Sequence, residues 1–132
     1  MLLFPGEENI VANVPGFLIE EIEYMDTSGI KLLMCKGKCN RALRPLSCRI
    51  FPVAPDIDEA GNVGVQPDAR GRRICPIWDL EYVDKTFIKT VEKAFASLAK
   101  NDKLLSFMRL LSSEQEKLRC IYKKRILKSG KI

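Results

Sequence analysis

Four cysteines of this chain have the spacing of metal ligands. Three fall within fourteen residues and the fourth precedes a proline: Cys35, Cys39, Cys48 and Cys75. Thiolates at short spacing bind soft or borderline cations such as zinc and iron, and four of them complete a tetrahedral shell. The pattern C-x3-C, followed after eight and twenty-six residues by single cysteines, is not the doubled C-x2-C of zinc ribbons. Spacing therefore predicts a metal site without distinguishing zinc from iron.

Other chemistries compete with a structural metal ion. The step Cys75-Pro76 is typical of iron–sulfur ligands, so an iron–sulfur cluster is a second interpretation. A third is a redox or nucleophilic thiol, favoured by neighbouring lysines and arginines. The chain has no histidine, which excludes a Cys-His nucleophile and leaves only carboxylates as a general base, such as Glu20, Glu21 or Asp79. A fourth, four unrelated cysteines, is disfavoured by the clustering. Cys120 stands apart, and we expect it to be a small core residue.

The residues around Cys48 resemble a known family. The string Arg44-Pro45-Leu-Ser-Cys48-Arg49-Ile-Phe51-Pro52, preceded by Cys35-x3-Cys39 and followed by Cys75-Pro76, is similar to the YkgJ-type cysteine-cluster family of bacteria. The resemblance covers most of residues 1–80 and implies a zinc- or iron-chelating domain. It implies four metal ligands, Cys35, Cys39, Cys48 and Cys75. It also implies Arg44 and Arg49 as charge-balancing donors to the sulfurs. Because no further cysteine flanks Cys35 or Cys39, one four-cysteine site is the most that the chain can build.

Composition limits the class of protein. With 132 residues, of which 46% are hydrophobic, the chain is expected to form one domain over 1–132. No apolar run approaches the roughly 20 residues of a membrane helix, and the first residues lack the features of a secretory signal. We therefore expect no membrane association and a cytoplasmic location, where thiols stay reduced.

The net charge of +5 is concentrated in two groups of residues. No acidic residue follows Lys117, and the basic residues from there on are expected to form the solvated face of a terminal helix. The second group is interleaved with the cysteines: Lys36, Lys38, Arg41, Arg44 and Arg49. Cations in this position offset the negative charge of a four-thiolate metal site, so they do not require a nucleic-acid partner.

The fold class expected from the pattern is α+β. Residues 17–24 and 30–34 alternate as two strands joined by a turn at 26–29, and a second hairpin is expected around 59–62, between flanks 50–53 and 63–65. The cysteines would lie on the loop between the hairpins. This β and loop half, 1–78, would pack against about three helices in the half 79–132.

Three helices are expected in the second half. The first is amphipathic through Phe87, Val91 and Phe95, with Asp84 as a candidate N-cap. A short helix would start at Asn101-Asp102. The segment Ser113-Glu114-Gln115-Glu116 has the pattern of a capping box and would begin the last helix.

The leading hypothesis is a small metal-binding protein in which four thiolates hold one zinc or iron ion in a mainly structural role. A closed shell of four protein ligands leaves no open position for substrate or water, so no reaction is assigned and an enzyme is not the favoured reading. One alternative is an iron–sulfur accessory protein serving an electron-transfer or modification enzyme. Another is a basic module that binds nucleic acid or an acidic protein through the residues from Lys117 onward. The expected partner is the metal ion, and a protein partner is compatible with the sequence. Binding to nucleic acid is not expected.

Overall fold

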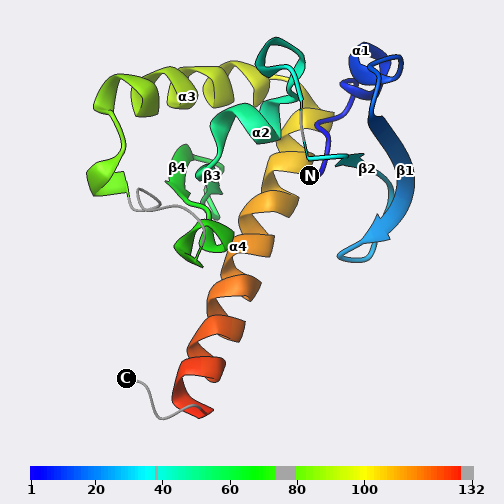
Figure 1. Ribbon diagram of the computed structural model, residues 1–132. Helices are drawn as coiled ribbons and strands as arrows, with labels where there is room; N and C mark the ends of the chain where they lie inside the picture. Colours follow the sequence, from blue (N-terminus) through cyan, green and yellow to red (C-terminus); the bar gives the residue numbers. More distant parts are fainter. Residues whose placement is uncertain (38, 74–79, 129–132) are drawn as a thin grey trace. The chain divides into compact units, whose positions relative to one another are not determined.

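The computed structural model describes residues 1–37, 39–73 and 80–128, the last with backbone only for 124–128; residues 72 and 73 are likewise described by backbone alone. The chain divides into two compact units, Met1–Phe51 and Pro52–Ile132. Each unit contains one two-stranded antiparallel sheet, and helices follow in the second (Figure 1). The expected α+β class with C-terminal helices is therefore confirmed. The boundary between the units lies before the second hairpin, so this hairpin belongs with the helices. The prediction of a single domain over residues 1–132 remains a prediction.

The first unit is built on a long hairpin. Strands β1 (Phe17–Tyr24) and β2 (Thr27–Cys35) pair antiparallel, with Phe17 opposite Cys35 and Ile22 opposite Ile30. The turn consists of Met25 and Asp26, both with positive φ, which is the backbone of a tight two-residue hairpin turn. The expected turn at 26–29 thus begins one residue earlier. Gly29, assigned from the sequence to the turn, lies in β2 with φ +77°, close to the irregularity in register that follows Ile22.

The N-terminal residues extend this hairpin and supply its core. Leu2 forms a bridge to Leu32, and the Leu3 amide donates to the Lys31 carbonyl at 2.9 Å. After the short helix α1 (Glu8–Val11), a buried cluster forms from Leu3, Val11 and Leu33. Partly buried apolar side chains pack against this cluster: Val14, Phe17 and Ile19. The unit ends with the 3-10 turn η1 (Arg41–Leu43) and helix α2 (Leu46–Ile50).

The second unit starts with the second hairpin. Strands β3 (Val53–Ile57) and β4 (Val63–Pro67) pair antiparallel, from Val53 opposite Pro67 to Ile57 opposite Val63. The Asp58 carboxylate closes the connecting loop by accepting from the backbone and side-chain amides of Asn62, each at 2.8 Å. The hairpin is where the sequence placed it. Its first strand, expected at 50–53, runs instead from 53 to 57, because residues 46–50 form α2.

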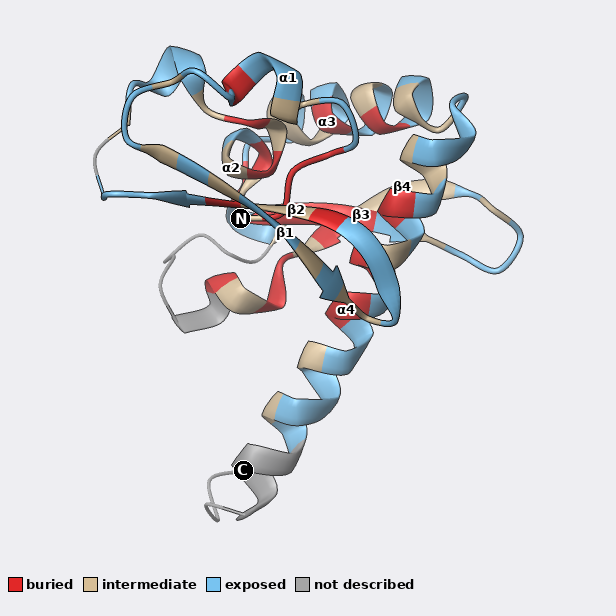
Figure 2. Ribbon diagram, turned by 90° about the vertical axis from the view of Figure 1, so that its right-hand side faces the viewer, coloured by how far each residue is buried: buried red, intermediate tan, exposed pale blue. Residues whose placement is uncertain are grey.

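Helices follow the 3-10 turns η2 (Ala69–Arg73) and η3 (Leu80–Tyr82). Helix α3 (Lys85–Leu98) begins at Asp84, whose carboxylate accepts from the amides of Thr86 and Phe87, so the predicted N-cap is confirmed. Helix α3 contacts β4, and α4 (Asp102–Lys128) contacts β3. In Figure 2 the part of α4 between residues 116 and 123 is mostly exposed. Across the part of the chain described, no helix combines the length and apolar character needed to span a membrane.

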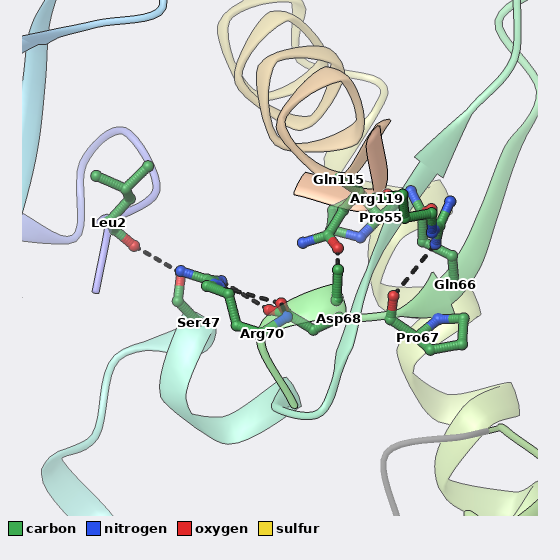
Figure 3. A network of polar contacts seen from close by, with 10 residues as sticks. Leu2, Ser47, Pro55, Gln66, Pro67, Asp68, Arg70, Gln115 and Arg119 are labelled. Carbon is green, nitrogen blue, oxygen red and sulfur yellow. Dashed lines mark hydrogen bonds and ion pairs between the residues drawn. The ribbon is translucent and has the colours of Figure 1, made fainter. Parts of the chain in front are cut away.

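One helix replaces the two that the sequence predicted after Asn101. Helix α4 continues through the segment read as a capping box, so the prediction of a helix start at Ser113 is wrong. Glu114 and Gln115 of this segment are buried, as is Ser112 just before it. The Ser112 hydroxyl accepts from the Ile57 amide at 3.1 Å, and the Gln115 side-chain oxygen accepts from the Ala69 amide at 2.7 Å (Figure 3). These side chains satisfy amides of β3 and η2 rather than the first turn of a new helix.

Candidate metal site

The three predicted ligands in the first unit lie on different elements. Cys35 is the last residue of β2 and is exposed, Cys39 follows in the connecting loop and is half-buried, and Cys48 lies half-buried in α2. The sequence placed all of them on loop, which is wrong for Cys35, at the end of a strand, and for Cys48, in a helix. Gly37 gives the C-x3-C segment a left-handed turn, with φ +89°. Cys75 lies outside the described residues.

Short-range contacts shape the loop that leads to Cys48. The Asn40 side chain accepts from the Ala42 amide at 3.0 Å and starts η1. Pro45 occupies the N-cap of α2, and its carbonyl accepts from the Cys48 amide at 3.0 Å. Proline suits the start of a helix because its fixed φ is already close to helical and it lacks an amide that would need a partner. The Arg-Pro step thus places Cys48 in the first turn of α2.

Two long-range hydrogen bonds fix α2 within its unit. The Glu7 carboxylate accepts from the Leu46 amide at 2.7 Å, which satisfies a free donor at the helix start. The Ser47 hydroxyl, in a buried position, donates to the Leu2 carbonyl at 2.6 Å (Figure 3). The helix that carries Cys48 is therefore attached to α1 and to the segment paired with β2.

Arg44 directly contacts one of the thiols. Its Nε donates to the Cys39 sulfur, 3.2 Å away. This contact is the main reason that the pKa of Arg44 is raised; the charges of Cys39, Cys48 and Cys35 add to it, while desolvation opposes it. One guanidinium group is thus within electrostatic reach of all three thiols.

Cys48 has the most distinct environment of the three. Burial raises the pKa of its thiol above the ordinary value, and the charges of Cys35 and Cys39 raise it further. The N-terminal amino group and Arg44 act in the opposite direction. Since each of these groups affects Cys48, the thiols of the first unit share one electrostatic environment, in which ionising a buried sulfur is costly without a nearby cation.

Arg49 has a different set of contacts. Its Nε donates to the Arg44 carbonyl and its Nη2 to the Ala42 carbonyl, both at 2.6 Å. These bonds hold the backbone between η1 and α2, and the residues described include no sulfur that Arg49 contacts. Its predicted role as a donor to the sulfurs stays a prediction.

The described residues at this site are of types that suit a soft metal ion, but the distances between them do not form a binding site. Cys35, Cys39 and Cys48 are free thiols, and Arg44 supplies a neighbouring positive charge. Within the described ranges, however, no three cysteine or carboxylate side chains are grouped closely enough to hold an ion. The first unit therefore offers donors and charge compensation, but not an assembled shell.

Cys120 and the basic terminal group lie in the second unit. Cys120 is exposed on α4, so the prediction that it is a core residue is wrong. Lys117, Arg119 and Lys123 are also exposed, as expected for a solvated helix face. Arg119 nevertheless donates to the Pro67 carbonyl at 3.3 Å, so part of this charge serves a contact with the end of β4 (Figure 3).

Sequence reasoning missed the roles of Glu7 and Ser47. Their partners, Leu46 and Leu2, are 39 and 45 residues away along the chain. No local pattern carries such information.

Comparison with protein-family models, curated proteins and solved structures finds no match to this chain. The resemblance to the YkgJ-type family accordingly stays a prediction that depends on the cysteine spacing and on the string around Cys48.

Proposed function

We propose that this protein binds one zinc or iron ion through cysteine thiolates and that the ion has a mainly structural role. The observation that carries the proposal is the 3.2 Å contact between Arg44 Nε and the Cys39 sulfur. Cys35, Cys39 and Cys48 are the proposed ligands within residues 1–51. Cys75, outside the described residues, is the fourth ligand on the basis of the sequence.

Electrostatics supports the proposal. A thiolate next to a guanidinium is stabilised, whereas several thiolates close together repel one another. A divalent cation relieves this repulsion, and its binding displaces the thiol protons. Four thiolates around a divalent ion leave two negative charges, which the nearby Arg44, Arg41 and Lys36 can offset.

A structural role follows from the elements that carry the ligands. Cys35 ends β2 and Cys48 lies in α2, and the described residues of the loop between them include the 3-10 turn η1. Shared ligation would join the end of the hairpin to α2 and close this loop. Four protein ligands also leave no coordination position for substrate, so the proposal includes no reaction.

Elemental analysis of freshly purified full-length protein tests metal binding. We expect about one zinc or iron per chain. Single Cys39→Ser and Cys48→Ser variants should lose most of the metal, while Cys120→Ser, an exposed cysteine of the second unit, should retain it. Equal metal content in all three variants would overturn the ligand assignment. Cys75→Ser tests the fourth ligand in the same way, and unchanged metal content would remove Cys75 from the set.

Two further measurements separate the kinds of metal centre. Protein purified without oxygen that is brown, and that loses visible absorption on oxidation, would identify an iron–sulfur cluster in place of a single ion. Removing the metal with a chelator should lower the melting temperature of the wild type but not of Cys48→Ser. Stability that is independent of metal would contradict the structural role.

A further inference from the structure

A cavity lies beside the cysteine loop, within residues 1–51. Its volume is about 310 Å³, and its apolar wall is formed by Ile10, Val11, Val14, Leu43, Pro45 and Leu46. Two of these side chains are conspicuously exposed for their type, Ile10 at 79% and Leu43 at 43%. The cavity is at the small end of the range for sites that bind small molecules. A concave apolar surface with exposed aliphatic side chains is suited to an apolar group of a ligand.

The charges that line the cavity are unbalanced. Arg44 and Arg49 contribute two positive charges and Glu7 one negative charge. Both oxygens of Glu7 are already bound by backbone amides, Oε2 by Phe4 at 2.9 Å and Oε1 by Leu46 at 2.7 Å. Both oxygens of the Glu7 carboxylate are therefore used in hydrogen bonds to the backbone. Among the described residues, Glu7 forms no ion pair with Arg44 or Arg49.

Both arginines retain donors that their own contacts do not use. Arg44 uses Nε for the Cys39 sulfur, and Arg49 uses Nε and Nη2 for backbone carbonyls. These hydrogen bonds, which include the Nε of each arginine, hold the two guanidinium groups in position. Among the described residues, no acceptor is found for either terminal nitrogen of Arg44 or for Nη1 of Arg49. Guanidinium groups that are held in place with free terminal donors are suited to bind a carboxylate.

We infer that this cavity binds a small amphiphilic carboxylate, with its apolar chain against Ile10, Val14 and Leu43 and its carboxylate on Arg44 and Arg49. Taking roughly 30 Å³ for each water-sized group, the cavity accommodates about ten non-hydrogen atoms. Octanoate has this size and both chemical features. The inference does not require a bound metal ion, because Glu7 and Arg49 are held by backbone groups and the contact of Arg44 with the Cys39 sulfur needs no ion.

Titration of the full-length, isotope-labelled protein with octanoate, followed by amide NMR, tests the inference. We expect saturable shifts at the amides of Val11, Val14 and Leu43. Octan-1-ol has the same chain length without the charge, and it should bind about tenfold more weakly. Equal binding of octanol and octanoate would overturn the assignment of the arginines, and the absence of saturable shifts at the cavity would overturn the whole inference.

A pair of variants tests the location. Ile10→Glu places a negative charge at the cavity and should weaken octanoate binding by about tenfold or more. Ile121→Glu makes the same change at an exposed isoleucine of α4 and should leave binding unchanged. Equal weakening in both variants, or in neither, would overturn the inference. Running each titration on metal-free and zinc-loaded protein separates this result from the proposed function, since binding in the metal-free protein is expected even if no zinc is taken up.

Discussion

The guanidinium of Arg44 donates through Nε to the sulfur of Cys39, five residues earlier in the chain. This bond takes one donor of a residue that also lines the neighbouring cavity. Arg44 thus connects the thiols with a second potential site. The guanidinium places a positive charge beside a proposed metal ligand, where it can offset part of the negative charge of a four-thiolate site.

Arg44→Gln should weaken zinc binding. Replacing a group that donates to a metal ligand typically lowers metal affinity by about 10- to 100-fold, and we expect an effect in this range. Competition with a chromophoric chelator measures it. Arg41→Gln is the matched control, since Arg41 is exposed in η1 and carries the same charge. Equal losses in the two variants would mean that net charge, and not the bond to Cys39, determines the affinity.

Cys48 should be slow to alkylate in the folded, metal-free protein. Burial is the main cause of its raised pKa, so at pH 8 the thiol form is favoured and the reactive thiolate is scarce. Its rate with iodoacetamide should keep rising with pH beyond the ordinary thiol range. Peptide mass spectrometry after timed labelling measures the rate. Urea-unfolded protein is the control, and there the rate at pH 8 should increase; equal rates in folded and unfolded protein would contradict the assignment of burial as the cause.

Local patterns gave most of the secondary structure. The two hairpins and the Asp84 cap depend on residues within a few positions of one another, and all three were predicted. Ser112 and Gln115 show where such patterns fail. A segment of serine, glutamate and glutamine suits both a helix start and the polar inner face of a continuing helix, and the choice depends on the amides of Ile57 and Ala69, 55 and 46 residues away.

The same limit applies to the candidate site. The cysteine spacing and the Arg-Pro step are local, so the sequence indicated the thiols and the residue that contacts one of them. The support of α2 by Glu7 depends on chain segments that only the fold brings together. The cavity, which shares Glu7 and Arg44, could not be predicted for the same reason.

Asp68 should make stability depend on acid pH. Burial by itself would raise the pKa of its carboxyl group, but hydrogen bonds and charge from Arg70, with a contribution from Gln115, hold that pKa below its usual value. The closest contact joins Asp68 Oδ2 to Arg70 Nη2 at 2.6 Å (Figure 3). A carboxyl group with a lowered pKa contributes stability above its unfolded pKa, about 4, and this contribution is lost as the pH falls through the folded value.

Asp68→Asn tests this pH dependence. At pH 7 the substitution should lower the free energy of unfolding by about 1–3 kcal/mol, because the buried residue 68 loses its charge-assisted hydrogen bonds with Arg70. The difference from wild type should shrink as the pH falls below about 4. Urea unfolding between pH 7 and pH 3 measures it, with Asp56→Asn at an exposed position of β3 as the control. A difference that stays constant over this range would exclude ionised Asp68 as its source.

Gln115 should be the polar residue of α4 on which stability depends most directly. Its side chain is 1% exposed, and its oxygen accepts from the Ala69 amide at 2.7 Å. Gln115→Leu keeps an apolar body of similar size but leaves this buried amide without its acceptor, which should cost about 1–3 kcal/mol. The adjacent Glu116 is exposed, so Glu116→Leu should change stability by no more than about 0.5 kcal/mol.

Hydrogen exchange distinguishes this mechanism from a general loss of packing. If Gln115 protects the Ala69 amide, exchange at Ala69 should accelerate in Gln115→Leu by more than the change in global stability accounts for. Amides in the middle of α3 should follow the global change alone. Unaltered protection at Ala69 would show that another group accepts the hydrogen bond of this amide. The hydrogen bond between Gln115 and η2 would then not explain why α4 continues through residue 115.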